Sequence, residues 1–199
     1  MVAKLSGPAP VTGDASRIGR RIVVYGPSGS GKSTVARQIG AVLSLPVVEL
    51  DALFHRPNWQ PTPEDEFRAK VLEALGRHDR GWVCDGNYGI ARDLILPLAE
   101  TVVWLRLPFR VVYWRLLKRT ITRFWTKELL WETNRESFRQ TFLSRDSILL
   151  WGISHWRAHF RNARQALKEI PHHATVVELY SMREVEQLLA SLATHSEGR

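Results

Sequence analysis

The chain has 199 residues, of which 44% are hydrophobic, and a domain of this size can bury a sizeable core. No apolar run approaches the length of a membrane span, so the composition argues against a membrane protein and favours a soluble, cytoplasmic one. The formal net charge of +8 is concentrated between Arg106 and Arg164, where thirteen Lys and Arg residues accompany only four acidic ones. Such a stretch attracts phosphate groups on a nucleotide, on a small substrate or along a nucleic acid.

The single cysteine, Cys84, excludes an internal disulfide and suits a reducing compartment. Because Cys84 lies within an apolar run, we expect a buried thiol without a catalytic role. Residues 1–20 contain Gly and Pro but no apolar segment, which predicts a flexible tail rather than a signal peptide. A single domain is expected over residues 21–193, followed by a short tail at 194–199.

Strands and helices alternate along this domain. The predicted strands are Arg21–Tyr25, Val47–Leu50, Trp82–Cys84, Thr101–Leu107 and Ala174–Tyr180. The predicted helices are Gly31–Leu43, a segment with Thr62 as its cap and Pro63 as its first residue that ends near His78, a short helix ending near Leu96, a long segment from Phe109, Arg145–Ile170 and Met182–Leu192. Strands separated by helices imply a parallel sheet covered on both faces, so we predict a three-layer α/β/α fold. Ligands of such sheets bind beyond the carboxyl ends of the strands.

The first predicted strand leads into Gly26-Pro27-Ser28-Gly29-Ser30-Gly31-Lys32-Ser33, which matches the P-loop pattern G-x-x-x-x-G-K-[ST]. The glycines allow backbone amides to turn around an anion, and the helix that follows adds its positive dipole end. We expect Lys32 to contact the outer phosphates of a nucleoside triphosphate and the Ser33 hydroxyl to coordinate Mg²⁺. A glycine-rich turn that binds nothing is disfavoured, because both flanking elements fit the motif. The predicted nucleotide-binding residues are Gly26, Pro27, Ser28, Gly29, Ser30, Gly31, Lys32, Ser33 and Thr34.

Two carboxylates, Asp51 and Asp85, each follow a predicted strand, so both are expected at the ligand edge of the sheet. Asp85 ends the strand expected beside the P-loop strand, where an Asp commonly orders the water shell of Mg²⁺, and a purely structural turn is the alternative. Asp51 could accept a proton from a substrate hydroxyl, bind the substrate or order metal-bound water. Alternatively, it caps a helix at Ala52–His55. His55 could face the same crevice or have a structural role.

Arg115, Arg119 and Arg123 recur every four residues and therefore share one stripe of a helix. An anion beside this stripe would relieve the repulsion between like charges, and arginine forks suit a triphosphate during transfer. A solvated basic face is the alternative. A helical lid is predicted over about residues 119–145, in which Arg135 could close on phosphates, and an ordinary exposed helix is the alternative there.

The chain contains eight tryptophans. Trp82 and Trp104 lie in predicted strands and are expected in the core. Trp59 lies in the loop after Asp51, where it could flank a substrate. Trp151 and Trp156 have arginines nearby and could stack on nucleic-acid bases, but packing of their helix onto the sheet is the favoured interpretation.

Three segments together resemble the adenylate-kinase-like P-loop proteins often labelled topology modulation proteins: residues 26–33, residues 48–54 with Trp59 beyond them, and residues 82–88. The resemblance extends from about residue 21 to residue 192. It implies a five-stranded parallel sheet of the nucleoside monophosphate kinase kind, with a lid over the nucleotide. The segment from Asp85 to Arg92 is also similar to the Asp-Gly-Phe-Pro-Arg segment of adenylate kinases, which implies that Asp85 lies near Mg²⁺ and that Arg92 holds the acceptor phosphate.

The acceptor region departs from adenylate kinases. Asn87-Tyr88 replaces Phe-Pro, Arg92 lies farther along the chain, and the Thr-Gly-Asp segment of adenylate kinases has no counterpart. Leu50-Asp51 is more similar to shikimate and gluconate kinases, and Arg106 stands where related proteins often carry Asp. No Cys-rich zinc lid is present.

The sequence therefore predicts an ATP-dependent phosphotransferase of the nucleoside or nucleotide kinase class, with ATP, Mg²⁺ and a small-molecule acceptor as ligands. The alternatives are an ATP-binding regulatory or nucleic-acid-binding protein that affects DNA topology, and a simple ATPase. The expected catalytic residues are Lys32, Asp51, Asp85, Arg119 and Arg123; the expected acceptor residues are Asp51, His55, Trp59, Asn87, Tyr88, Arg92 and Arg135; the expected metal ligands are Ser33 and Asp85.

Overall fold

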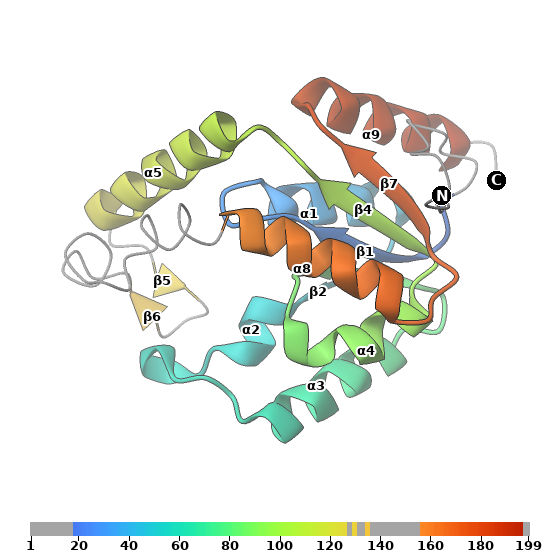
Figure 1. Cartoon of the computed structure of the whole chain (residues 1–199), viewed down its shortest axis with the longest axis horizontal. Helices are drawn as coiled ribbons and strands as arrows, with labels where there is room; N and C mark the ends of the chain where they lie inside the picture. Colours follow the sequence, from blue (N-terminus) through green and yellow to red (C-terminus); the bar gives the residue numbers. More distant parts are fainter. Residues whose placement is uncertain (1–17, 127–128, 131–133, 136–155, 197–199) are drawn as a thin grey trace, which may run out of the picture.

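The structure, a computed structural model, describes residues 18–126, 129–130, 134–135 and 156–196 of the chain (Figure 1). Its centre is a parallel sheet of five strands in the order β2-β3-β1-β4-β7. This is the α/β architecture that the alternating pattern of the sequence predicts. The strands are β1 (Arg21–Tyr25), β2 (Val47–Glu49), β3 (Trp82–Asp85), β4 (Thr101–Leu105) and β7 (Thr175–Leu179).

Helices cover both faces of the sheet and form the two outer layers (Figure 1). One face carries α1 (Lys32–Leu43) and α9 (Met182–Ser196), and the other carries α3 (Glu64–Gly76), α4 (Arg92–Ile95) and α8 (Trp156–Glu169). The remaining elements are α2 (Leu50–Phe54), α5 (Phe109–Thr126), the 3-10 turns η2 (Pro57–Trp59), η3 (Gly89–Ala91) and η4 (Leu96–Leu98), and the two-residue strands β5 (Leu129–Leu130) and β6 (Asn134–Arg135).

Strand β1 shows how the core is divided between the two faces. Ile22 and Val24 pack with α1 and α9, whereas Val23 and Tyr25 pack with the helices of the opposite face. Successive side chains of a strand point to opposite faces, so a strand covered on both sides is apolar along its whole length. The residues that the sequence predicts in the core, Trp82, Cys84 and Trp104, are all buried.

The carboxyl ends of β1, β2 and β3 meet at one edge of the sheet. Val24 of β1 pairs with Asp85 of β3, and Glu49 of β2 pairs with Asp85 from the other side. Strand β3 therefore lies directly beside the P-loop strand, as the sequence predicts. This arrangement brings Asp85 and the residues that follow β2 to the same edge as the loop between β1 and α1.

Strand β2 is shorter than predicted because Leu50 begins α2 instead of ending the strand. Leu50 is buried in either conformation, so its apolar character does not distinguish them. Asp51 consequently lies in the first turn of α2, and Glu49 stands at the N-cap position. The alternative that Asp51 caps a helix at Ala52–His55 is therefore wrong.

Helix α3 also begins differently, with Pro63 at its N-cap position and Glu64 as its first residue. Thr62 is buried, and its hydroxyl donates to the backbone oxygen of Leu53 at 3.0 Å. Thr62 therefore fastens the loop after α2 instead of capping α3. Other boundaries shift by a few residues: α1 begins at Lys32, α3 ends at Gly76, β3 includes Asp85, β4 ends at Leu105, β7 spans Thr175–Leu179 and α9 reaches Ser196.

The predicted lid, about residues 119–145, lies largely outside the described residues. Within the described part, α5 continues to Thr126, and β5 and β6 form a short antiparallel pair that lies against η2. The predicted helix Arg145–Ile170 is described from Trp156, where α8 begins, to Glu169. Trp151 lies outside the described residues.

Candidate active site

The P-loop curves around the amino end of α1. Gly29 and Gly31 have φ angles of 84° and 90°, a left-handed conformation that glycine adopts readily and other residues rarely do. Gly31 stands at the N-cap position of α1, and the backbone amide of Ser30 donates to the oxygen of Pro27 at 3.1 Å. The loop thus has the turned geometry and the helix end on which anion binding by a P-loop depends.

The Lys32 side chain lies among the charged groups of the site. Its Nζ donates to the oxygen of Pro27 at 3.5 Å, so the side chain folds back over the loop. Burial lowers the pKa of Lys32, while the negative charges of Asp85 and Asp51 act in the opposite direction and Arg119 reinforces the lowering. The structure therefore brings together four of the five predicted catalytic residues.

Asp85 is 6% exposed at the end of β3. Burial raises its pKa, and the charge of Lys32 and a hydrogen bond from Ser33 oppose that rise. Its Oδ1 atom has no hydrogen-bond partner among the described residues. A buried carboxylate with one unused oxygen, bonded to the P-loop serine, fits the hard oxygen donors that Mg²⁺ prefers.

A second group of predicted residues surrounds Asp51 on the α2 side. The Tyr88 hydroxyl donates to Asp51 Oδ1 at 2.6 Å and lies 3.5 Å from His55 Nε2. The His55 ring contacts two other aromatic rings and meets both edge to face. Its centroid is 5.2 Å from that of Phe54 and 5.3 Å from that of Trp59. Burial lowers the pKa of His55, which favours its neutral form, although the charge of Asp51 acts against this. Asp51 is itself exposed, so its carboxylate can meet a ligand.

Asn87 and Arg92 form a third group, between β3 and α8. Arg92 Nε donates to Asn87 Oδ1 at 2.7 Å, and Arg92 Nη1 donates to the backbone oxygen of Asn162 at 3.1 Å. Arg92 therefore connects the predicted acceptor segment to α8. The Nδ2 atom of Asn87 is buried and has no hydrogen-bond partner in the described part of the chain.

His159 of α8 belongs to the same neighbourhood, although nothing in the sequence pattern indicates it. It stands one helical turn before Asn162, the α8 residue that Arg92 contacts, and its Nε2 atom has no hydrogen-bond partner among the residues described. Burial, together with the positive charges of Lys32 and Arg92, lowers the pKa of His159 to about 4. A neutral imidazole thus faces two cations of the site. The sequence offers no signal for this, because the placement depends on how α8 docks.

His159 makes the stability of the fold depend on pH. Its pKa is about 4 when folded and about 6.5 when unfolded, so between these values the unfolded chain binds more protons and stability falls as pH falls. Between about pH 7 and pH 4, the free energy of unfolding of the wild type should therefore fall by up to about 3 kcal/mol more than that of His159→Gln. Denaturant unfolding at each pH measures both. His173→Gln, at an exposed position before β7, is the control. Parallel pH profiles for wild type and His159→Gln would contradict the assignment.

Helix α5 lies over the P-loop. A Cβ atom at Gly29 would lie only 2.7 Å from the backbone oxygen of Val112, and one at Gly31 would lie 3.8 Å from Arg115 Nη1. Arg119 Nη2 donates to the Ser28 hydroxyl at 3.4 Å. Two arginines of the predicted stripe therefore face the phosphate-binding loop, which argues against a merely solvated basic face for them.

Not all predicted residues can be placed to the same extent. Thr34 is exposed in the first turn of α1, and Ser30 is buried in the loop. A Cβ atom added at Gly26 would lie only 2.5 Å from the Ser30 hydroxyl oxygen, so this position has no room for a side chain. The backbone of Arg123 belongs to α5 and that of Arg135 to β6, but their side chains lie outside the described part of the structure.

The structure is similar to three solved kinase structures over most of their lengths. The first is a gluconokinase from Sinorhizobium meliloti 1021 (TM-score 0.50, 22% identity, 92% of this chain and 96% of that chain). The second is the shikimate kinase from Acinetobacter baumannii in complex with shikimate (TM-score 0.53, 16% identity, 93% and 97%). The third is the shikimate kinase from Bacteroides thetaiotaomicron (TM-score 0.51, 17% identity, 89% and 98%). These similarities show that the chain shares the fold of P-loop kinases.

No protein-family model matches the sequence, and no curated protein matches it. The resemblance to topology modulation proteins therefore stays a prediction. Within the described part of the chain, none of the helices has the length and apolar character needed to cross a membrane.

Proposed function

We propose that this protein is an ATP-dependent kinase that transfers the γ-phosphoryl group of Mg-ATP to a hydroxyl group of a small molecule. The observation that carries the proposal is the position of Lys32, on a P-loop and close enough to Asp85 and Asp51 for both negative charges to act on its pKa. A phosphate-binding lysine, a buried carboxylate at the P-loop serine and an exposed carboxylate nearby are the groups that phosphoryl transfer requires. The fold shared with a gluconokinase and two shikimate kinases supports the same reaction class.

The nucleotide side of the reaction is assigned to the P-loop. The backbone amides of residues 29–33 and the Lys32 ammonium would hold the β- and γ-phosphates, and Arg119, beside Ser28, would cover their outer oxygens. Ser33 and Asp85 would hold Mg²⁺, which when bound neutralises charge on the phosphates. Placing these groups in advance lowers the barrier mainly through electrostatics, because they need little rearrangement during transfer.

The acceptor side is assigned to Asp51 and its neighbours. Tyr88 donates to one oxygen of the Asp51 carboxylate, which leaves the other oxygen for an acceptor hydroxyl. In the transfer step the acceptor oxygen bonds to the γ-phosphorus, the bond between that phosphorus and the β–γ bridging oxygen breaks, and Asp51 takes the hydroxyl proton. ADP leaves with the bridging oxygen. His55 and Trp59, next to Tyr88, would contact the body of the acceptor.

The charges around this region favour an acceptor that is recognised mainly through hydroxyl groups. Arg68 is held in a two-pronged ion pair with Asp93, at 2.8 and 2.7 Å, and also donates to the oxygen of Ile90. Arg92 is engaged by Asn87 and α8. Of the groups around Asp51, the phenol of Tyr88 and the neutral ring of His55 are hydrogen-bonding partners suited to hydroxyls.

The test is a screen for acceptor-dependent ADP release with purified protein and Mg-ATP. Nucleosides, nucleoside monophosphates, sugars and small hydroxy acids form the panel. We expect one of these classes to raise ADP release well above the rate with water alone. ADP release that no acceptor stimulates would instead favour a simple ATPase. No turnover together with DNA binding that weakens steeply with salt would favour the nucleic-acid-binding alternative.

A further inference from the structure

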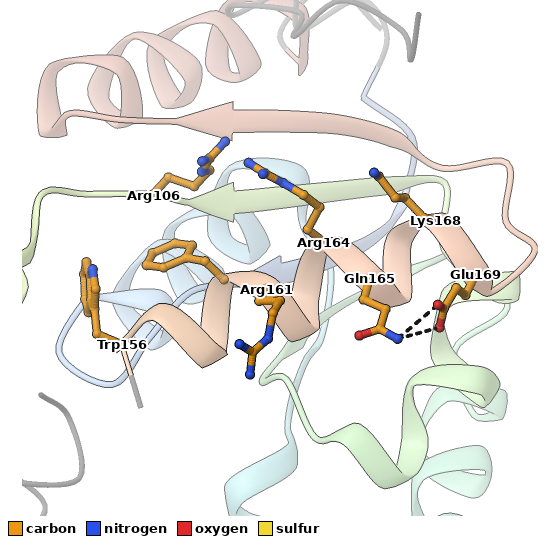
Figure 2. A pocket seen from close by; sticks show the side chains of 8 residues that line it. Arg106, Trp156, Arg161, Arg164, Gln165, Lys168 and Glu169 are labelled. Atoms are coloured by element: carbon orange, nitrogen blue, oxygen red, sulfur yellow. Dashed lines mark hydrogen bonds between the residues drawn. The ribbon is translucent and has the colours of Figure 1, made fainter. Parts of the chain in front are cut away.

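A groove of about 550 Å³ runs along α8 (Figure 2). None of the residues that line it belongs to the P-loop or to the groups around Asp51 and Asn87 described above. Its volume falls in the range of about 300–1,000 Å³ that is typical of small-molecule sites. The groove is lined by Arg106, Trp156, Phe160, Arg161, Arg164, Gln165, Lys168 and Glu169.

The groove carries an excess of positive charge. Arg106, Arg164 and Lys168 extend toward the same side of α8, beside the strand β7 (Figure 2). In the part of the chain that the structure describes, no carboxylate forms an ion pair with Arg164 or Lys168. Glu169, the one acid of the lining, accepts both of its hydrogen bonds from Gln165 Nε2, at 3.0 and 3.2 Å. Arg164 and Lys168 are therefore not neutralised by the acid beside them.

Arg106 gives the groove a fixed end. Its guanidinium lies 5.0 Å from the Trp104 and Tyr180 ring centroids and 6.0 Å from that of Phe160, and it also bonds to Glu178. Arg164 lies close enough to Tyr180 for its charge to act on the tyrosine's pKa, so it stands near this end. Lys168 follows Arg164 by one helical turn, about 6 Å along the axis. The spacing suits two anionic groups linked by one or a few atoms.

We propose that this groove is a second anion site, which binds a small polyanion carrying two linked phosphate groups. Single-stranded nucleic acid offers the same phosphate chemistry but requires aromatic faces on which bases can stack. Here the ring of Trp156 is packed edge to face against Phe109 and Phe160, at 5.1 and 5.0 Å, so the groove supplies cations rather than a stacking platform. The site is separate from the P-loop, and it does not rest on the proposed kinase activity.

The test measures binding of inorganic pyrophosphate by calorimetry in a Lys32→Ala background, which removes the P-loop lysine as a competing phosphate ligand. We expect pyrophosphate to bind this protein and its affinity to fall about tenfold or more when Arg164→Gln and Lys168→Gln are added. Both residues are exposed, so the substitutions should leave the fold intact. The matched control adds Arg80→Gln and Arg183→Gln, two exposed cations outside the groove, and should bind pyrophosphate as the background does.

Three results would overturn the proposal. The first is absence of pyrophosphate binding in the Lys32→Ala protein. The second is equal weakening by the groove pair and the control pair, which would indicate a general effect of net charge. The third is that a thymidine oligonucleotide binds and pyrophosphate does not, with an affinity that falls steeply between about 50 and about 200 mM salt and depends on Arg164 and Lys168. That result would identify the groove as a nucleic-acid surface.

Discussion

Replacing Lys32 with alanine is expected to reduce acceptor-dependent ADP release by about 10³-fold or more, because the ammonium would stabilise charge on the transferring phosphoryl group. The thermal unfolding midpoint should change little. The one hydrogen bond that Lys32 Nζ makes among the described residues is a long one, 3.5 Å from the Pro27 oxygen, and alanine has a high helix propensity. ADP release and thermal unfolding are measured on the same preparation.

Lys70→Ala provides the matched control, because that lysine lies on α3 in an exposed pair with Glu66, remote from the P-loop. Its turnover should equal that of wild type. If Lys32→Ala proves unstable, Lys32→Met retains the aliphatic stem and removes only the charge. Wild-type turnover in either Lys32 variant would remove the basis of the proposed function.

Asn substitutions at Asp51 and Asp85 are expected to have different consequences. Asp85 is buried and bonded to Ser33, so Asp85→Asn should weaken Mg²⁺-dependent ATP use with any acceptor, including slow transfer to water. Asp51 is exposed and held by Tyr88, so Asp51→Asn should spare basal hydrolysis and remove acceptor-stimulated turnover by about 10²–10⁴-fold. Basal and stimulated ADP release, each followed across a Mg²⁺ titration, separate the two effects.

Asp65→Asn, an exposed acid in the first turn of α3, controls for the loss of one negative charge. Equal loss of basal and stimulated activity in the Asp51 and Asp85 variants would show that both acids serve one metal site. In that case the division between a metal side and an acceptor side would be wrong, although phosphoryl transfer itself could still occur.

The parts of the fold that the sequence predicts well are those in which local pattern and burial agree. The run before Gly26 is apolar on consecutive positions and rich in β-branched residues, which is typical of a strand buried on both faces, and all of Ile22–Tyr25 are buried in β1. Leu50 shows the opposite case, because a buried apolar residue fits the end of a strand or the start of a helix equally well. Thr62 likewise has the chemistry of a cap, but a tertiary contact with Leu53 takes its hydroxyl.

The candidate site could be predicted only as far as each residue is tied to a strand end or a motif. Asp51 and Asp85 follow strands, and sheet geometry brings them together. His159 and the pair of Arg68 with Asp93 arise from the docking of separate helices, which leaves no periodic signal in the sequence. The spacing of the arginines in α5 predicts that they share one face of a helix. That this face is turned toward the P-loop depends on the packing of α5 against Gly29, which the spacing does not determine.

Because Cys84 is buried, the rate at which a thiol reagent modifies it measures how often the fold opens. The only thiol in the chain is fully buried in β3, between β1 and β2, and burial raises its pKa, so a thiol reagent should reach it only when the sheet separates. A ligand that binds only the closed fold slows that reaction by the factor 1 + [L]/Kd. The labelling rate of one cysteine can therefore rank nucleotides, candidate acceptors and polyanions by affinity before any product of catalysis is known.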